Sequence, residues 1–380
     1  MEIIQQMLSG YGLYSDKSYQ FHYKPLMMNS LKYALAYLVP VVVAASIHYA
    51  GIFSYFALVF LFGCLPLIEL FTKGSTQNLS EVEEELVKKD KAYDLLIYGL
   101  VPIQYALLIY FLIQVSDAHL PQYVRIGMII AFGLSCGILG INAAHELGHR
   151  KTWYEQLMSK MLLLTSLYMH FFIEHNRGHH KNVSTDHDPA SSRYGEMVYA
   201  FYFRSIIGSW LSAWHLESEK LKRKKQHFFS FHNEMLVFQF IQIVLLAGIG
   251  YVFGIVALLS FMASALLGIL LLETVNYIEH YGLRRQKKGD VYERTSPVHS
   301  WNSNHPLGRL MLFELSRHSD HHYIASRKYQ SLRHFEESPQ MPTGYPGMML
   351  LSLLPPLWFR VMHRRIQMYK DTLPLGRELA

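Results

Sequence analysis

Long apolar stretches and polar segments alternate along the 380 residues of the chain. A helix needs about 20 apolar residues to cross the hydrocarbon core of a membrane. Stretches of this length predict six transmembrane helices, near residues 31–50, 53–72, 93–115, 123–145, 233–254 and 256–279. Because the loops at 50–52, 116–121 and about 255 are very short, the six predicted helices form three hairpins.

Composition supports this interpretation. Hydrophobic residues make up 51% of the chain and charged residues 17%, whereas roughly a quarter of the residues of a soluble domain are charged. So little charge cannot cover a soluble globule, and the sequence predicts an all-α integral membrane protein. The N-terminus lacks the pattern of a cleaved signal peptide, so we expect the first apolar stretch to remain as an anchor.

The positive charges predict the orientation of the helices. Of the 35 Lys and Arg residues, only Arg125 lies near the hairpin tips. The positive-inside rule therefore places the other polar regions and both termini in the cytoplasm. The predicted organisation is an N-terminal cytoplasmic segment (1–30), a six-helix transmembrane region (31–280) with a cytoplasmic insert (146–232), and a C-terminal cytoplasmic cap (281–380). No basic module with interleaved aromatic residues points to nucleic acid.

The 21 histidines of the chain are clustered. Residues three or four apart share one face of a helix, a spacing that lets two imidazoles hold one metal ion. Four motifs contain such closely spaced histidines or a histidine at the end of a predicted helix. They are NAAHELGHR, FFIEHNRGHH, NYIEHYG and RHSDHHY, which contain His145, His149, His175, His179, His180, His280, His318, His321 and His322.

The predicted topology brings these motifs together. The fourth and sixth helices each cross about 30 Å before they deliver His145 and His280, so both residues emerge at the same membrane face. Nine imidazoles exceed what one ion can use and suit two ions. Imidazole binds iron, copper, zinc and nickel. The two cysteines, Cys64 and Cys136, lie in apolar runs and cannot form an iron–sulfur or four-thiolate zinc site.

Four carboxylates lie beside the candidate ligands. In such positions a carboxylate can accept a hydrogen bond from the second ring nitrogen of a histidine and fix its tautomer. One of them could instead bind metal directly, and each could also be an ordinary solvated or salt-bridged side chain. The predicted second-shell residues are Glu146, Glu174, Glu279 and Asp320.

The histidine motifs HELGHR, EHNRGHH, NYIEHYGL and RHSDHH together resemble those of the membrane-bound alkane 1-monooxygenases, or alkane hydroxylases. These enzymes belong to the integral-membrane histidine-box family that includes fatty acid desaturases and xylene monooxygenase. The resemblance extends to DPASSRYGE, RSIIGSWLSAWHLE, HSWNSNH, KYQSLR and SPQMPTGYPGMMLLSLLPPLW, and covers most of the chain from the fourth predicted helix onward.

The resemblance implies a non-haem diiron monooxygenase. Such an enzyme hydroxylates the terminal carbon of a medium-chain linear alkane with O₂ and gives a primary alcohol. The nine histidines would be the iron ligands. Electrons would come from rubredoxin, which an NAD(P)H-dependent reductase reduces. The enzyme would lie in a bacterial inner membrane with its active site facing the cytoplasm.

Two further features, a substrate tunnel and a docking surface, would serve this chemistry. An apolar tunnel between the helices would deliver the hydrocarbon, and we expect it to contain Leu65, Leu100, Ile138 and Leu271, although ordinary packing also explains these residues. A basic surface would dock an acidic electron carrier. Its predicted residues are Lys222, Arg223, Lys224, Arg284, Arg285 and Lys287. The stretch 215–226 could instead contact anionic lipid.

Other functions remain open at this point. A fatty acid desaturase or a lipid hydroxylase of the same family could use a similar cluster. A divalent-metal transporter would place ionisable residues near the middle of the membrane, whereas Glu69 and Glu273 lie off-centre and could be interface or tunnel-mouth residues. A structural zinc site would usually contain cysteines.

Overall fold

The computed structural model describes residues 29–371. Helices make up most of this range, which confirms the predicted all-α class. Two short strands, β1 (Lys287–Lys288) and β2 (Val291–Tyr292), pair as an antiparallel hairpin. Residues 1–28 of the predicted N-terminal segment lie outside the described residues.

The first half of the chain supplies most of the apolar helices. They are η2 (Lys32–Tyr37), α3 (Leu38–Tyr49), η3 (Gly51–Tyr55), α4 (Phe56–Val59), η4 (Phe60–Cys64), α5 (Leu65–Phe71), α6 (Glu81–Lys89), α7 (Lys91–Tyr98), α8 (Leu100–Val115), α9 (Gln122–Ser135), η5 (Cys136–Ile141) and α10 (Asn142–Gly148). The second half continues with α11 (Trp153–Leu164), α12 (Phe171–Glu174), η6 (His175–His179), α13 (His180–Asn182), α14 (Val198–Arg223), α15 (Glu234–His280), η7 (Pro297–His299), α16 (Pro306–Met311), α17 (His318–Tyr323), η8 (Tyr329–Ser331), α18 (Tyr345–Ser352) and α19 (Pro355–Lys370).

Five helical segments of the described chain are long and apolar enough to cross a membrane. They are Asn29–Tyr49, Gly51–Phe71, Lys91–Val115, Gln122–Gly148 and Glu234–His280. Six separate helices were expected, but α15 contains both the fifth and the sixth predicted stretches in 47 residues. These segments make the chain a multi-pass membrane protein, whereas the number of crossings stays a prediction.

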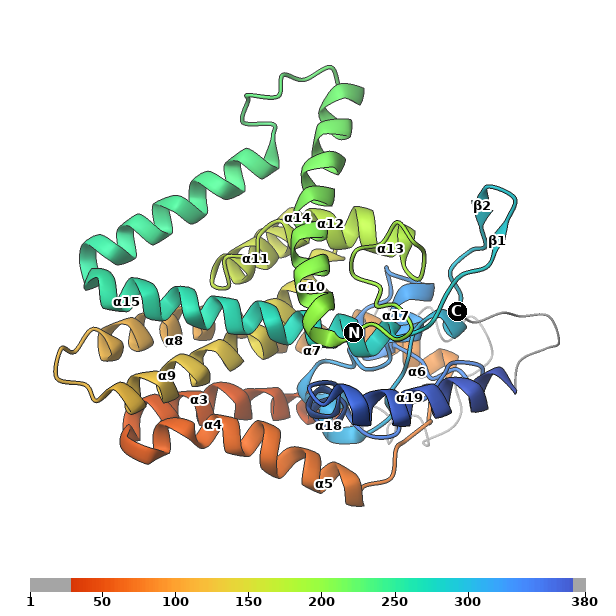
Figure 1. The fold of residues 1–380 in the computed structure, drawn as a ribbon, viewed down its shortest axis with the longest axis horizontal. Helices are drawn as coiled ribbons and strands as arrows, with labels where there is room; N and C mark the ends of the chain where they lie inside the picture. The colour runs from red at the N-terminus through yellow and green to blue at the C-terminus, as the bar shows by residue number, and fades with distance from the viewer. Residues whose placement is uncertain (1–28, 372–380) are drawn as a thin grey trace, which may run out of the picture.

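A sharp turn inside α15 explains the difference in number. Gly254 has a φ of 82° and a ψ of 175°, a conformation that glycine reaches without a steric penalty. Figure 1 shows α15 reversing its direction on the left of the view, so that it forms two arms. The sequence has no polar loop at this point, and only the backbone conformation of one glycine separates the two predicted helices.

The segment formed by α9, η5 and α10 is the most enclosed of the five. In its most apolar stretch 67% of the residues are buried, compared with 28% for Gly51–Phe71. It packs closely on the second arm of α15, where a Cβ at Gly268 would lie 2.6 Å from the Cβ of Cys136. This close packing fixes the height at which α10 presents its histidines.

The insert and the C-terminal region pack together at one end of the helices. Ser184 Oγ donates a hydrogen bond to the carbonyl of His299 at 2.8 Å, and Arg285 N donates to the carbonyl of Ser184 at 2.8 Å. The segment after α5 joins them, because Asn78 Nδ2 donates to the carbonyl of His334 at 2.9 Å. Figure 1 shows this assembly on the right of the view. Its position relative to the cytoplasm stays a prediction.

Candidate metal centre

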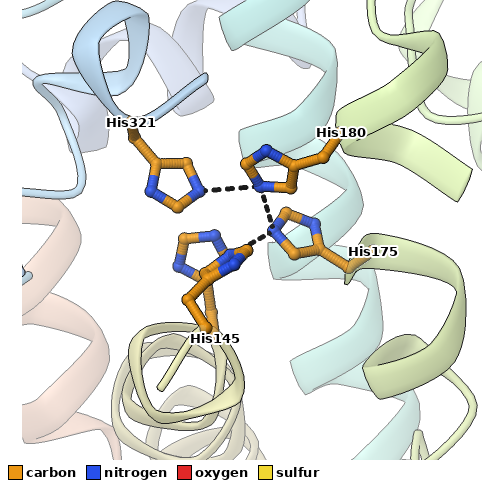
Figure 2. Close-up of side chains that lie close together, drawn as sticks. His145, His175, His180 and His321 are labelled. Atoms are coloured by element: carbon orange, nitrogen blue, oxygen red, sulfur yellow. Dashed lines mark hydrogen bonds between the residues drawn. The ribbon is translucent and has the colours of Figure 1, made fainter. Parts of the chain in front are cut away.

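The nine predicted histidines lie in two compact groups. The imidazole nitrogens that could bind metal lie within 4.8 Å of one another inside each group. Figure 2 shows four rings of the first group pointing toward a common space. The first group contains His145, His149, His175, His180 and His321, and the second contains His179, His280, His318 and His322.

A wide helical turn places His175 and His180 in the first group. The segment η6 is a π-helix, in which backbone hydrogen bonds join residues five apart. His175 and His180 are five apart, and their Nε2 atoms lie 3.1 Å from each other. His179, four residues after His175, turns into the second group, where its Nε2 lies 3.2 Å from that of His322.

The short helix α17 divides its histidines in a similar way. His318 and His322 are one α-helical turn apart, and their Nε2 atoms lie 2.9 Å apart in the second group. His321 projects to the first group, where its Nε2 lies 3.0 Å from that of His180. Residues three or four apart were expected to hold one ion together, but His175 and His179 lie in different groups, as do His318 and His321.

The electrostatics of both groups suit a cation. Burial, followed by the neighbouring imidazoles, lowers the pKa values of His175, His321 and His322 well below their ordinary range. These rings are therefore neutral near pH 7, the form in which imidazole binds metal. Neutral rings that carry their proton on Nδ1 present only lone pairs at Nε2, and a metal ion is a partner that several lone pairs can share. The donor set fits iron as well as other transition metals.

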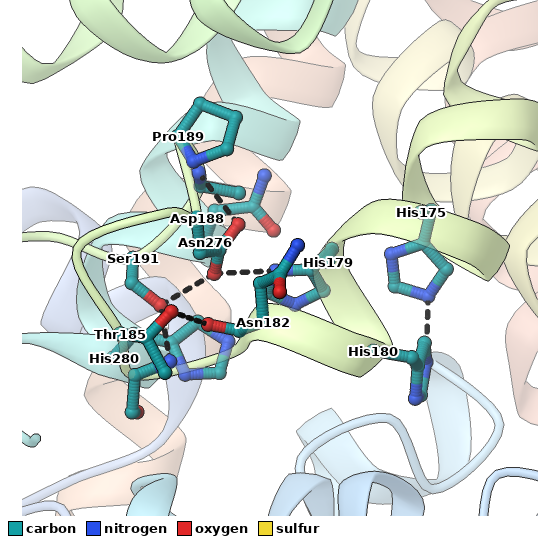
Figure 3. Close-up of polar contacts among 12 residues, drawn as sticks. His175, His179, His180, Asn182, Thr185, Asp188, Pro189, Ser191, Asn276 and His280 are labelled. Atoms are coloured by element: carbon teal, nitrogen blue, oxygen red, sulfur yellow. Dashed lines mark hydrogen bonds and ion pairs between the residues drawn. The ribbon is translucent and has the colours of Figure 1, made fainter. Parts of the chain in front are cut away.

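Asp188 orients one of the rings, and the sequence analysis did not identify it. His179 Nδ1 lies 2.8 Å from Asp188 Oδ2, and both side chains are fully enclosed. Figure 3 shows Asp188 between His179 and Ser191, whose hydroxyl donates to the same carboxylate oxygen at 2.5 Å. This bond keeps the proton of His179 on Nδ1 and leaves Nε2 free. In the sequence, the indication of a role for Asp188 is that it begins DPASSRYGE, a stretch that resembles the family.

Of the four carboxylates predicted beside the ligands, Glu279 lies in contact with a histidine ring. Glu279 Oε2 lies 3.1 Å from His318 Nε2, and Glu279 Oε1 accepts a hydrogen bond from Tyr345 at 2.7 Å. Glu279 therefore faces the nitrogen that would bind metal rather than the outer ring nitrogen. Among the described residues, Nδ1 of His318 and Nδ1 of His322 have no hydrogen-bond partner.

The other three carboxylates bind elsewhere. Glu146 pairs with Arg150 at 2.7 Å, and Asp320 pairs with Arg327 at 2.6 Å. Glu174 accepts a hydrogen bond from Ser212 Oγ at 3.4 Å. Burial, together with the charge of Asp188, raises the pKa of Glu174 to about 8. These three carboxylates were predicted from their positions beside histidines in the sequence. Adjacent residues of a helix point in different directions, so such a position does not bring a carboxylate to the neighbouring ring.

An apolar cavity opens onto both histidine groups. His145, His175 and His318 belong to its lining together with Asn142, Asn276 and Glu279. Of the four predicted tunnel residues, Leu65, Ile138 and Leu271 line this cavity. Leu100 is fully buried in the core and does not line this cavity, so its place in a tunnel stays a prediction.

The six predicted docking residues do not form one surface. Lys222, Arg223 and Lys224 lie at the end of α14, which Figure 1 places at the top of the view. The other three lie beside the β1–β2 hairpin on the right. Arg285 is also structural, because its Nη1 donates to the carbonyl of Lys181 at 2.9 Å. This separation depends on the direction of α14 relative to the hairpin, which the sequence does not show.

Comparisons with known proteins agree with this centre. The model of the fatty acid desaturase family matches residues 119–352. The chain is 43% identical over 314 residues to the alkane 1-monooxygenase of Ectopseudomonas oleovorans, which covers 82% of this chain and 77% of that protein. It is 41% identical over 304 residues to alkane 1-monooxygenase 1 of Alcanivorax borkumensis, covering 80% and 75%.

A more distant relative is the hydroxylase component of the xylene/toluene monooxygenase of Pseudomonas putida, which is 29% identical over 236 residues and covers 62% of this chain and 63% of that protein. The region matched by the family model, residues 119–352, contains all four histidine motifs of this chain. The resemblance found in the sequence is confirmed, and the chain belongs to the alkane 1-monooxygenase family, within the wider fatty acid desaturase family.

Proposed function

We propose that the chain is a diiron monooxygenase that hydroxylates the terminal carbon of medium-chain linear alkanes. The observation that carries the proposal is the position of two buried imidazole groups beside an apolar cavity. The relatives named alkane 1-monooxygenase give the reaction its class. One oxygen atom of O₂ enters the C–H bond as a hydroxyl group, and the other leaves as water with two electrons and two protons.

Two iron ions are the proposed cofactor, one held by the group of five imidazoles and one by the group of four. Bound iron would supply the oxidising power for an unactivated C–H bond, which no acid, base or nucleophile of the protein possesses. Glu279 presents an oxygen to the same space as His318 Nε2 and is the carboxylate best placed to assist the second ion.

The protein residues supply binding and orientation. Leu65, Ile138 and Leu271 hold a hydrocarbon in a water-poor space that leads to the histidines. Asp188 fixes the tautomer of His179. Because the cavity lining is largely apolar, a long unbranched chain fits it better than a polar molecule.

Rubredoxin, reduced by an NAD(P)H-dependent reductase, is the proposed electron donor. Arg284 lines a small surface pocket together with Asp188, which bonds His179. An acidic carrier bound at this pocket would lie beside the carboxylate that bonds a member of the second histidine group.

We place the histidine groups on the cytoplasmic side of a bacterial inner membrane. The support is the distribution of Lys and Arg, which gather on the same end of the helices as the histidines. A reductant in the cytoplasm reaches the centre directly in this orientation.

The experiment that tests the function combines metal analysis with product identification. The purified chain is reconstituted in lipid with a rubredoxin, its reductase and NADH, and is given a series of n-alkanes and fatty acids. We expect about two iron ions per chain and primary alcohols from n-alkanes. Unsaturated fatty acids as the main product would assign the chain to desaturation instead, and alkane-independent metal uptake into vesicles would assign it to transport.

A further inference from the structure

The carboxyl group of Glu69 is unusual in the wall of the apolar cavity. Glu69 lies on α5, is 1% exposed and belongs to the cavity lining. Its Oε1 accepts a hydrogen bond from Gly308 N at 2.7 Å. Its Oε2 is buried and has no hydrogen-bond partner in the part of the chain that the structure describes. Half of the carboxyl group is therefore satisfied by the protein, and half is not.

The protein makes room for this carboxyl group. A side chain at Gly344 would overlap Glu69 Oε2, and a Cβ at Gly308 would lie 3.0 Å from Oε1. Two glycines on separate segments thus leave a seat that the carboxyl group fills. Leaving a buried oxygen without a partner is unfavourable, so a ligand group that pairs with Oε2 gains affinity.

The chemistry of the cavity limits what this partner is. Most of the lining is apolar, so the ligand carries a long hydrocarbon chain. An alkane has no group that pairs with Oε2. A hydroxyl group can donate to an ionised carboxylate or accept from a protonated carboxyl, and it therefore fits Glu69 in either form.

We infer that Glu69 is a hydroxyl-binding residue, which holds a linear primary alcohol inside the cavity through Oε2. The alcohol chain then lies in the apolar space whose lining also contains His145, His175 and His318. The inference deepens the proposed function, since a primary alcohol is the product of that reaction. Binding of the alcohol requires neither turnover nor electrons.

Asn142 is the competing site for the hydroxyl group. It also lines the cavity, and its Nδ2 is buried without a partner among the described residues. Asn142 lies one helical turn before His145, at the histidine end of the cavity. Glu69 lies in a wall formed by α5, α16 and α18, which contain none of the nine histidines. The two sites can be separated by mutation.

The test compares the binding of n-octanol and n-nonane, which have equal numbers of non-hydrogen atoms. Affinities are measured by competition with radiolabelled n-octanol on the full chain in lipid nanodiscs, and partition into protein-free nanodiscs is subtracted. We expect Glu69→Met to weaken n-octanol binding about tenfold and to leave n-nonane binding unchanged. Glu69→Gln keeps a polar group at the same place and is expected to retain most of the n-octanol affinity.

The control variant is Glu155→Met. Glu155 is also a buried glutamate, bonded to Tyr98 at 2.7 Å, but it does not line the cavity. We expect this variant to bind n-octanol like the wild type. Unchanged n-octanol affinity in Glu69→Met overturns the inference, as does an affinity that depends on Asn142→Leu instead.

A measurement on the unmutated chain covers the case in which Glu69→Met does not fold. Infrared difference spectra of the wild type are recorded with n-octanol and with n-nonane. We expect n-octanol to shift a carboxyl band that is missing in Glu69→Gln, and n-nonane to leave it in place. No band shift with n-octanol overturns the inference. The spectra report binding and do not require hydroxylase activity. A failure of this inference can therefore be distinguished from a failure of the proposed function.

Discussion

At the residue scale, the centre depends on which nitrogen each imidazole presents. In both groups Nε2 atoms face one another at about 3 Å, as for His149 and His175 at 3.0 Å and for His280 and His318 at 3.2 Å. Burial lowers the pKa values of His321 and His322 well below the ordinary value and keeps these two rings neutral. Unshared lone pairs at this separation repel, and a bound cation removes that repulsion.

The number of donors predicts an unequal response to loss of a ligand. His322→Ala leaves three imidazoles in the second group, whereas His321→Ala leaves four in the first. We expect His322→Ala to retain about one metal ion per chain and His321→Ala to retain more than one, measured by elemental analysis after a fixed time with a chelator. His187→Ala, outside both groups, is the control and should bind metal like the wild type. Equal metal contents in all three variants would contradict the assignment of donors.

The bond between Asp188 and His179 predicts a second residue-scale effect. Asp188→Asn removes the charge that holds the Nδ1 proton, and loss of such an outer partner costs about 10–100-fold in metal affinity. The rate at which a chelator removes metal measures this change. Asp186→Asn makes the same substitution two residues away at a carboxylate that contacts Arg284, and we expect it to leave the rate unchanged. A similar rate in both variants would show that Asp188 has no influence on the metal.

At the scale of elements, single turns decide which side chains meet. The π-turn η6 places residues five apart on one side, so His175 and His180 share a group and His179 does not. A second π-turn, η5, precedes α10 and contributes Gly137 and Ile138 to the cavity. Wide turns of this kind are frequent at functional sites. The extra residue in the turn changes which side chains share one face of the helix.

The contact between α15 and η5 leads to a stability prediction. Gly268→Ala adds a Cβ at 2.6 Å from Cys136 Cβ and at 3.1 Å from the backbone of Gly137. Overpacking of this kind destabilises by about 1–3 kcal/mol, so we expect a lower midpoint of thermal unfolding in detergent, followed by circular dichroism. Gly248→Ala on the other arm of α15 meets no atom within 4 Å and is the matched control. A midpoint equal to that of the control would mean that the helices adjust freely.

The β1–β2 hairpin leads to a prediction about electron transfer. Arg284→Glu combined with Lys287→Glu reverses one charge in the small pocket that contains Asp188 and one charge in β1. We expect the apparent KM for rubredoxin to rise about tenfold at low ionic strength, and the difference to shrink as salt is added. The triple reversal of Lys222, Arg223 and Lys224 at the end of α14 is the comparison, and we expect a smaller change. A larger effect there would move the docking surface to α14.

At the scale of the whole molecule, three separate regions close over one end of the helices. The segment after α5, the insert and the C-terminal region meet through bonds such as Arg333 with Glu84 and Arg317 Nη2 with the carbonyl of Gln77 at 2.8 Å. The two histidine groups lie where these regions meet the helices that carry His145 and His280.

The orientation of the molecule can be tested by cysteine labelling in intact cells. In a background without Cys64, His119→Cys places a thiol at the tip between α8 and α9, and Asp290→Cys places one in the β1–β2 hairpin. The distribution of Lys and Arg predicts that an impermeant reagent labels His119→Cys from outside, and Asp290→Cys only after the membrane is opened. The reverse pattern would place the histidine groups outside the cytoplasm.

The sequence by itself determined the helical membrane class, the approximate limits of the helices and the identity of the nine clustered histidines. Apolar length and motif spacing are local properties, and they are readable without the fold. The tertiary structure decided how the histidines divide, that Asp188 rather than Glu146, Glu174 or Asp320 orients a ring, and that Leu100 lies outside the cavity. These outcomes depend on turns of one residue, such as η6 and Gly254, and on contacts between segments more than a hundred residues apart, which no local pattern records.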